Sequence, residues 1–146
     1  MLQLAQFIAA LSCTIFAGAA IYINLVEHPA RMGCPTDLAA TVWASSYKRA
    51  TFMQAPLALI SSAAAIVSWF LGGGVFWLVG GAIIVAVVPF TLLVIAPTNR
   101  DLLKPGRDLT SPNTRALLDR WGQLHAVRSF LSLVASAIFL LLLTYS

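Results

Sequence analysis

Residues 51–95 read TFMQAPLALISSAAAIVSWFLGGGVFWLVGGAIIVAVVPFTLLVI, and this stretch decides the fold. It contains no Asp, Glu, Lys or Arg, and the glycine run Gly72–Gly74 divides it into two apolar halves. Each half, 51–71 and 75–95, has about the 20 residues that a helix needs to cross the hydrocarbon core of a bilayer. A linker of this length forces the chain to reverse, so the stretch predicts two antiparallel, neighbouring transmembrane helices.

Two further apolar stretches, at about 4–26 and 124–145, meet the same length criterion. Hydrophobic residues make up 60% of the chain and charged residues 10%, whereas soluble domains carry about 25% charged residues. We therefore predict an all-α fold, a four-helix transmembrane bundle that forms a single integral membrane domain over residues 1–146. The polar segments 27–50 and 96–123 would connect the spans.

The distribution of positive charge predicts the orientation in the membrane. All nine Lys and Arg residues fall within or beside the two polar segments, and the opposite side carries none. The positive-inside rule then predicts cytoplasmic polar segments and both termini outside, as in a bacterial plasma membrane. No basic residue precedes the first span, so a cleaved signal peptide is not expected. The few charges flank apolar spans, which argues against nucleic acid as a partner.

Short local signals predict how the polar segments fold. Residues 35–37 are typical of a helix start, with Thr36 or Asp37 as the capping residue. Ser111 followed by proline predicts an N-cap and a helix that runs on into the last span. The Lys-Pro-Gly sequence at 104–106 predicts a turn between these helices.

Polar residues cluster at the same end of every predicted span, at spacings that put them on one helix face. The clusters are Asn24, Glu27 and His28; Tyr47, Thr51 and Gln54; Asn99 and Arg100; and Trp121, His125 and Arg128. Lipid offers such groups no partner, so they usually face the bundle interior or a wet cavity. We therefore predict a substrate pocket at one membrane face.

The residue types in these clusters indicate the chemistry. A histidine can take or give a proton near neutral pH. An arginine in a cavity that is partly shielded from water stabilises an oxyanion or phenolate. We take His125 and Arg128 as candidate catalytic residues. The candidate substrate-binding residues are Trp121, Asn99, Glu27, His28, Arg100, Tyr47 and Gln54.

Simpler roles compete with this interpretation. Trp121 and Tyr47 are also typical of the aromatic belt at a membrane interface, and Arg128 is near enough to a helix end to reach lipid phosphates. His125 fits a structural hydrogen bond between helices equally well. A metal held by Glu27, His28 and His125 is disfavoured, because no helix carries paired ligands at metal-binding spacing. A haem between the two histidines is disfavoured, because it would need both rings buried in the bundle and both lie near an end of their spans.

Three short motifs carry a resemblance to a known family. They are the small-residue run 17–20 leading to Pro29, the motif Pro97-x-Asn99-x-x-Leu102, and the motif Trp121-x-x-Leu124-His125-x-x-Arg128. On these motifs, and on its span lengths, nearly the whole chain resembles the anthrone oxygenase-like family (DUF1772) of small four-span membrane proteins.

The resemblance implies an activity. Fungal members of the family oxidise anthrones to anthraquinones with molecular oxygen, without a flavin or haem, so the expected cofactor is none. The positions that match are Asn99, Trp121, His125 and Arg128. In such a reaction His125 would be the base, with Glu27 or His28 as alternatives. Arg128, with or without Arg100, would supply the positive charge, and Asn99 would orient either group.

A function from another class fits the same features. The protein would then be a non-catalytic membrane protein that binds a small hydrophobic ligand or serves as a subunit of a membrane complex. Its partners in either case are the lipid bilayer and a small hydrophobic aromatic molecule. Helices rich in Ala and Gly are also compatible with a homo-oligomer.

Overall fold

The computed structural model describes residues 1–145 as four long helical rods. The elements are α1 (Leu2–Tyr22), η1 (Ile23–Glu27), α2 (His28–Met32), α3 (Thr36–Phe70), α4 (Phe76–Phe90), η2 (Thr91–Ile95), α5 (Ala96–Leu102) and α6 (Pro112–Thr144). The first rod is α1–η1–α2 and the third is α4–η2–α5, each with a π-helical turn inside it. All four rods are long and apolar enough to cross a membrane. The prediction of a four-helix transmembrane bundle is confirmed, and this architecture indicates an integral membrane protein.

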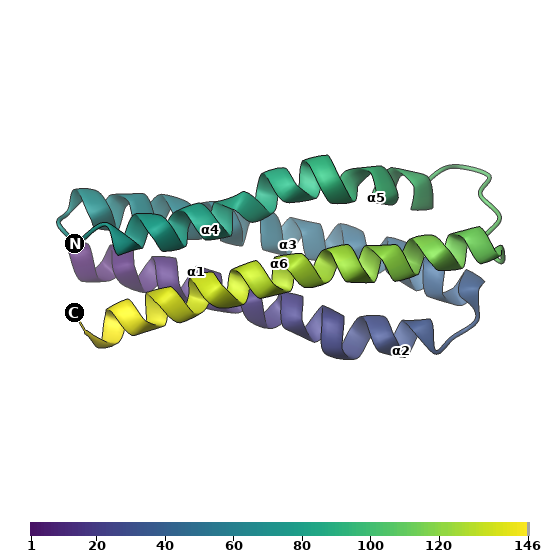
Figure 1. The fold of residues 1–146 in the computed structure, drawn as a ribbon, viewed down its shortest axis with the longest axis horizontal. Helices are drawn as coiled ribbons and strands as arrows, with labels where there is room; N and C mark the ends of the chain where they lie inside the picture. Colours follow the sequence, from purple (N-terminus) through teal and green to yellow (C-terminus); the bar gives the residue numbers. More distant parts are fainter. Residues whose placement is uncertain (146) are drawn as a thin grey trace.

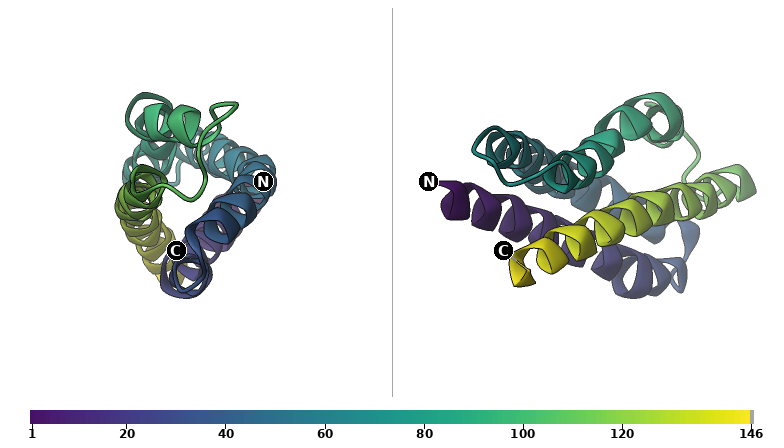
Figure 2. Two further views of the ribbon diagram at one scale, coloured as in Figure 1. Left: turned by 90° about the vertical axis from the view of Figure 1, so that its right-hand side faces the viewer. Right: turned by 60° about the vertical axis from the view of Figure 1, so that its left-hand side comes forward.

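The rods alternate in direction, so both termini lie at one end of the bundle and the two polar connections at the other (Figure 1). Seen along its length, the bundle has the rods at the corners of a square (Figure 2). The α1 rod packs on α3 and α6, and α4 packs on the same two helices. The predicted glycine linker joins α3 to α4, and Gly72 and Gly74 have φ angles of 92° and 87°, which favour glycine.

Most of the two polar segments is helical, since the rods continue well beyond the predicted spans. Ser111 caps α6 as predicted, because its Oγ accepts a hydrogen bond from the Thr114 backbone N–H at 3.2 Å. The predicted start of α3 at Thr36 is right, but the predicted cap is wrong. Pro35 occupies the cap position, and its side chain makes no capping hydrogen bond.

The turn predicted at 104–106 is present, and Gly106 adopts a φ of 74° there. Beyond it, the Thr110 side-chain hydroxyl and backbone N–H donate to Asp108 at 2.7 and 2.9 Å. These bonds, led by that of the hydroxyl, hold the pKa of Asp108 below its ordinary value. Arg115 of α6 donates to the backbone carbonyl oxygens of Met32 and Cys34, where the first rod ends. The carbonyl groups that a helix end leaves unpaired are thereby satisfied.

Two apolar clusters fill the bundle, one toward each end. The cluster near the termini includes Trp77 of α4 stacked on Phe139 of α6, with ring centroids 5.3 Å apart. Gly80 lets that ring approach the α4 backbone, since a Cβ at this position would lie 2.5 Å from Phe139 Cε1. The other cluster is built around Trp43, Leu118 and Trp121. The predicted site residues lie in and beside this second cluster.

Candidate functional site

A small cavity, here called the polar cavity, lies between the first rod, α3 and α6. Its volume is about 20 Å³, which gives room for a molecule about the size of water. Its walls are Ile23, Glu27, Arg31, Ser46, Tyr47, Ala50, Thr51, Gln54, Trp121, His125 and Arg128. Most of the predicted site residues therefore surround one space.

The hydrogen bonds around His125 define its tautomer. Asn24 of η1 donates its amide Nδ2–H to the Gly122 carbonyl oxygen at 3.1 Å, which orients the amide. Its Oδ1 then accepts from His125 Nδ1 at 2.6 Å and from Ser129 Oγ at 2.5 Å. Because an amide oxygen only accepts, the neutral imidazole carries its proton on Nδ1. The Nε2 atom is left with a lone pair, on a ring that is 1% exposed and lines the polar cavity.

Arg128 lies three residues further along α6 and forms the next part of the wall. Its guanidinium donates to Gln54 Oε1 of α3 at 2.8 Å and lies 5.6 Å from the centre of the Phe16 ring. Gln54 Nε2 and Arg128 Nε are buried and have no hydrogen-bond partner among the described residues. Buried polar atoms normally have a partner, so these two atoms point to a polar ligand or water at this position.

Trp121 is the aromatic centre of the site. Its ring lies 4.8 Å from that of His125, 5.2 Å from that of His28 and 5.8 Å from that of Trp43. The His28 ring packs directly over Gly122, where an added Cβ would lie 2.5 Å from His28 Nε2. These contacts hold Trp121 in one orientation, with its indole forming part of the cavity wall.

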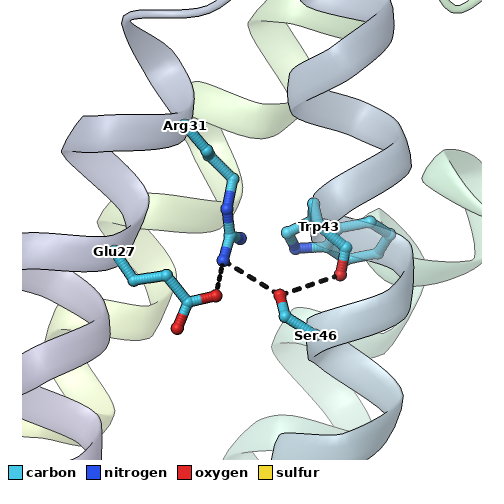
Figure 3. Close-up of polar contacts among 4 residues, drawn as sticks. All are labelled: Glu27, Arg31, Trp43 and Ser46. Atoms are coloured by element: carbon cyan, nitrogen blue, oxygen red, sulfur yellow. Dashed lines mark hydrogen bonds and ion pairs between the residues drawn. The ribbon is translucent and has the colours of Figure 1, made fainter.

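An ion pair closes the cavity on the side of the first rod. The Arg31 guanidinium donates to Glu27 Oε1 one helical turn earlier and to Ser46 Oγ of α3 at 2.9 Å. Ser46 Oγ in turn donates to the Trp43 carbonyl oxygen at 3.3 Å. Figure 3 shows the guanidinium reaching from the first rod toward α3, between the Glu27 carboxylate and Ser46. The pair joins α2 to α3 at the edge of the cavity.

The remaining predicted residues lie outside the cavity wall, at different distances from it. Asn99 of α5 is buried behind Tyr47 and donates to its hydroxyl oxygen at 3.2 Å. His28 is held on the site through Trp121. The structure places the Arg100 side chain on the exposed surface of α5, and it lines none of the cavities described here.

The predicted common face of Asn24, Glu27 and His28 is wrong for Glu27. Asn24 and His28 both contact α6, whereas Glu27 lies beside Arg31 on the side of α3. The cause is η1, because a π turn contains more residues than an α turn and rotates the residues that follow. Across this turn a spacing of four residues still marks one face, as Asn24 and His28 show, whereas the spacing of three between Asn24 and Glu27 does not.

Three wall and support residues were absent from the predicted site. In the sequence, Arg31 contributes only to the predicted orientation, although its position four residues after Glu27 is a signal for an ion pair. Asn24 belongs to the predicted polar face, but its spacing alone indicates no specific role. Ser129, four residues after His125 on α6, shares the hydrogen bonds of Asn24.

The side chains at the site can be compared with those that a metal ion needs as ligands. Across the residues that the structure describes, no group of three His, Cys, Asp or Glu side chains is placed to hold a metal ion. The two histidine rings both pack on Trp121. The cavity wall offers a proton acceptor at His125, positive charge at Arg128 and a flat aromatic surface at Trp121.

Comparison with known proteins identifies the family. The chain is similar to the anthrone oxygenase tpcL of Aspergillus fumigatus, with 40% identity over 70 residues. That alignment covers 46% of this chain and 44% of the fungal protein, so it spans less than half of that relative. No solved structure matches the chain. The family model described as anthrone oxygenase matches residues 43–138, which include α6 from its start through His125 and Arg128. Because this match covers more than half of the sequence, the chain belongs to the anthrone oxygenase family.

Proposed function

We propose that the protein is an oxygenase that converts the activated methylene of a flat, lipid-soluble phenolic compound, such as an anthrone, into a carbonyl with molecular oxygen. Membership of the family supports an oxygenase-like function in general. The observation that carries the finer proposal is the tautomer of His125, whose Nε2 lone pair belongs to a ring in the cavity wall. A base in that position suits a substrate whose first step is loss of a proton.

In the first step, His125 Nε2 accepts one proton from the methylene that two rings flank. The carbon keeps the electron pair, which delocalises over the rings. One electron of this anion passes to dioxygen and gives superoxide and a carbon radical. The two radicals join in a C–O bond, and the peroxide takes the proton back from His125. The substrate itself supplies the electrons, so this step needs no cofactor.

In the second step, the remaining methylene hydrogen leaves as a proton. Its electron pair forms the C=O bond while the O–O bond breaks. The departing hydroxide takes a proton and becomes water. The balance is one methylene and one dioxygen consumed for one carbonyl and one water formed. Arg128 lies beside His125 in the cavity wall, where its positive charge stabilises superoxide and peroxide as they form.

Oxygen uptake by the purified protein in detergent, with an anthrone as substrate, tests this proposal. We expect uptake above the spontaneous rate, with one dioxygen consumed per carbonyl formed and no loss in the presence of a chelator. With ¹⁸O₂, one labelled atom should enter the product and one should enter water. Uptake equal to that of buffer with detergent alone, over a series of anthrones, would contradict the proposal.

We also propose that the protein lies in a bacterial plasma membrane with both polar connections in the cytoplasm. The one-sided distribution of the basic residues supports this orientation. Cys34 is a natural reporter, because it is half-buried in the connection after α2, whereas Cys13 is buried in the bundle. A membrane-impermeant maleimide should label Cys34 in inverted membrane vesicles and spare it in right-side-out ones. The reverse pattern would place the polar connections outside.

A further inference from the structure

A second cavity, here called the apolar cavity, adjoins the polar cavity on its α4 side. Its volume is about 140 Å³, several times that of the polar cavity. It is lined by Phe16, Tyr47, Thr51, Ala55, Ala58, Val87, Val88, Thr91, Leu92 and Arg128. Tyr47, Thr51 and Arg128 line both cavities, so these three side chains form the wall that the cavities share.

The apolar cavity runs from the bundle interior to its outer surface. Phe16, Ala58 and Val87 form its inner part and are at most 2% exposed. Ala55 and Leu92 lie at its outer edge, where Leu92 is 65% exposed. Because these edge residues belong to rods that cross the membrane, the cavity opens sideways toward lipid, between α3 and η2.

The inner part of this cavity offers a ligand no free hydrogen-bonding group. The hydroxyl hydrogen of Thr91 is already used in a hydrogen bond, which Oγ1 donates to the Val87 carbonyl oxygen at 2.7 Å. At the shared wall the chemistry changes. There the Arg128 guanidinium lies next to Gln54, which lines the polar cavity only, and among the described residues neither Arg128 Nε nor Gln54 Nε2 has a hydrogen-bond partner. Such a combination fits a ligand with a wide apolar body and an oxygen-bearing edge.

We propose that the apolar cavity binds the inner part of the substrate's fused rings, since a cavity of this volume holds about one benzene ring. The rest of the ring system then extends between α3 and η2, where the substrate enters directly from the bilayer. The inference rests on the proposed function and adds to it a binding site and an entry route. The reacting carbon lies at the shared wall beside Arg128 and faces the polar cavity. The polar cavity has room for a molecule about the size of water and is too small for a ring, so the fused rings stay on the side of the apolar cavity.

The substitution Ala55→Phe tests this site, because it adds an aromatic ring at the outer edge of the cavity without filling the core. Ala63→Phe is the matched control, since Ala63 is exposed on the same helix about two turns further on. The probe is anthraquinone, which has no methylene and cannot react. Its binding in detergent is followed by quenching of the tryptophan fluorescence, and neither substitution changes the set of tryptophans.

We expect Ala55→Phe to weaken anthraquinone binding at least tenfold, and Ala63→Phe to bind it like the wild-type protein. Both variants should keep the thermal unfolding temperature of the wild type. Equal binding by wild type and Ala55→Phe, or equal loss in both variants, would overturn the assignment of the cavity. Since binding is measured without turnover, a failure of oxygen uptake with intact binding would reject the proposed reaction and leave the site in place.

Discussion

Replacing His125 with glutamine is expected to lower kcat/KM for anthrone oxidation by about 10²- to 10⁴-fold, the usual contribution of a general base. Glutamine retains a side-chain N–H that can donate to Asn24, so the hydrogen bonds that position η1 against α6 are preserved. What it lacks is a lone pair basic enough to accept the methylene proton. Oxygen uptake at several substrate concentrations, corrected for the spontaneous rate, measures the loss.

The control for this variant is Gln123→Ala. Gln123 is exposed on the same helix, two residues before His125, and lines none of the cavities described here. Its replacement should leave both kcat and KM unchanged. If His125→Gln retained full activity in a folded protein, the base would be another residue, and Glu27 would be the next wall residue to test.

The second large effect is expected at Arg128. Changing Arg128 to methionine should lower kcat by about 10²- to 10³-fold, similar to the loss of one donor from an oxyanion hole. The KM should change much less, because the positive charge matters most once superoxide and peroxide have formed. Arg128→Lys keeps a charge but not the planar guanidinium, so it should recover part of the lost rate.

Stability is the obvious confounding factor for an arginine in a membrane bundle. Methionine has a similar length and no charge to desolvate, but it leaves the buried Gln54 Oε1 without its donor, which costs about 1–3 kcal/mol. The unfolding temperature of Arg128→Met should therefore be somewhat lower than that of the wild type, and kcat is compared well below the unfolding transition of the variant. Arg120→Met, at an exposed position about two turns earlier on α6, is the matched control for loss of charge. A normal kcat in Arg128→Met would remove Arg128 from the mechanism.

The parts of the fold and site that follow from regular helix geometry were predictable from the sequence. Apolar length determined the four spans, and the glycine run determined the α3–α4 hairpin. On α3 and α6, spacings of four and seven residues identified side chains that do share a cavity, such as Tyr47 with Gln54 and His125 with its neighbours. These helices contain no π turn in that region, so the spacing rule holds.

The remaining features depend on contacts between distant parts of the chain. Asn24 and His125 are separated by 101 positions, and sequence spacing could place them at one depth but not orient one toward the other. The same limit applies to Arg100, which has the right depth but lies on the outer side of α5. The π turn η1 could not be predicted from the local sequence, because a π turn forms where packing and hydrogen bonds across the bundle favour it.

The π turn in the first rod has a consequence for how this protein tolerates evolutionary change in length. Deleting one residue from Ile23–Glu27 would let the backbone relax into an ordinary α-helix, which is harmless in isolation. Because a π turn holds about one residue more than an α turn, the residues after the deletion would keep nearly the same rotation relative to α1. His28 would stay on Trp121 and Arg31 beside Ser46, whereas the same deletion in the regular part of α1 would turn both away by about 100°. In lineages that retain this site, single-residue deletions should therefore be more frequent within this π turn than elsewhere in the first rod.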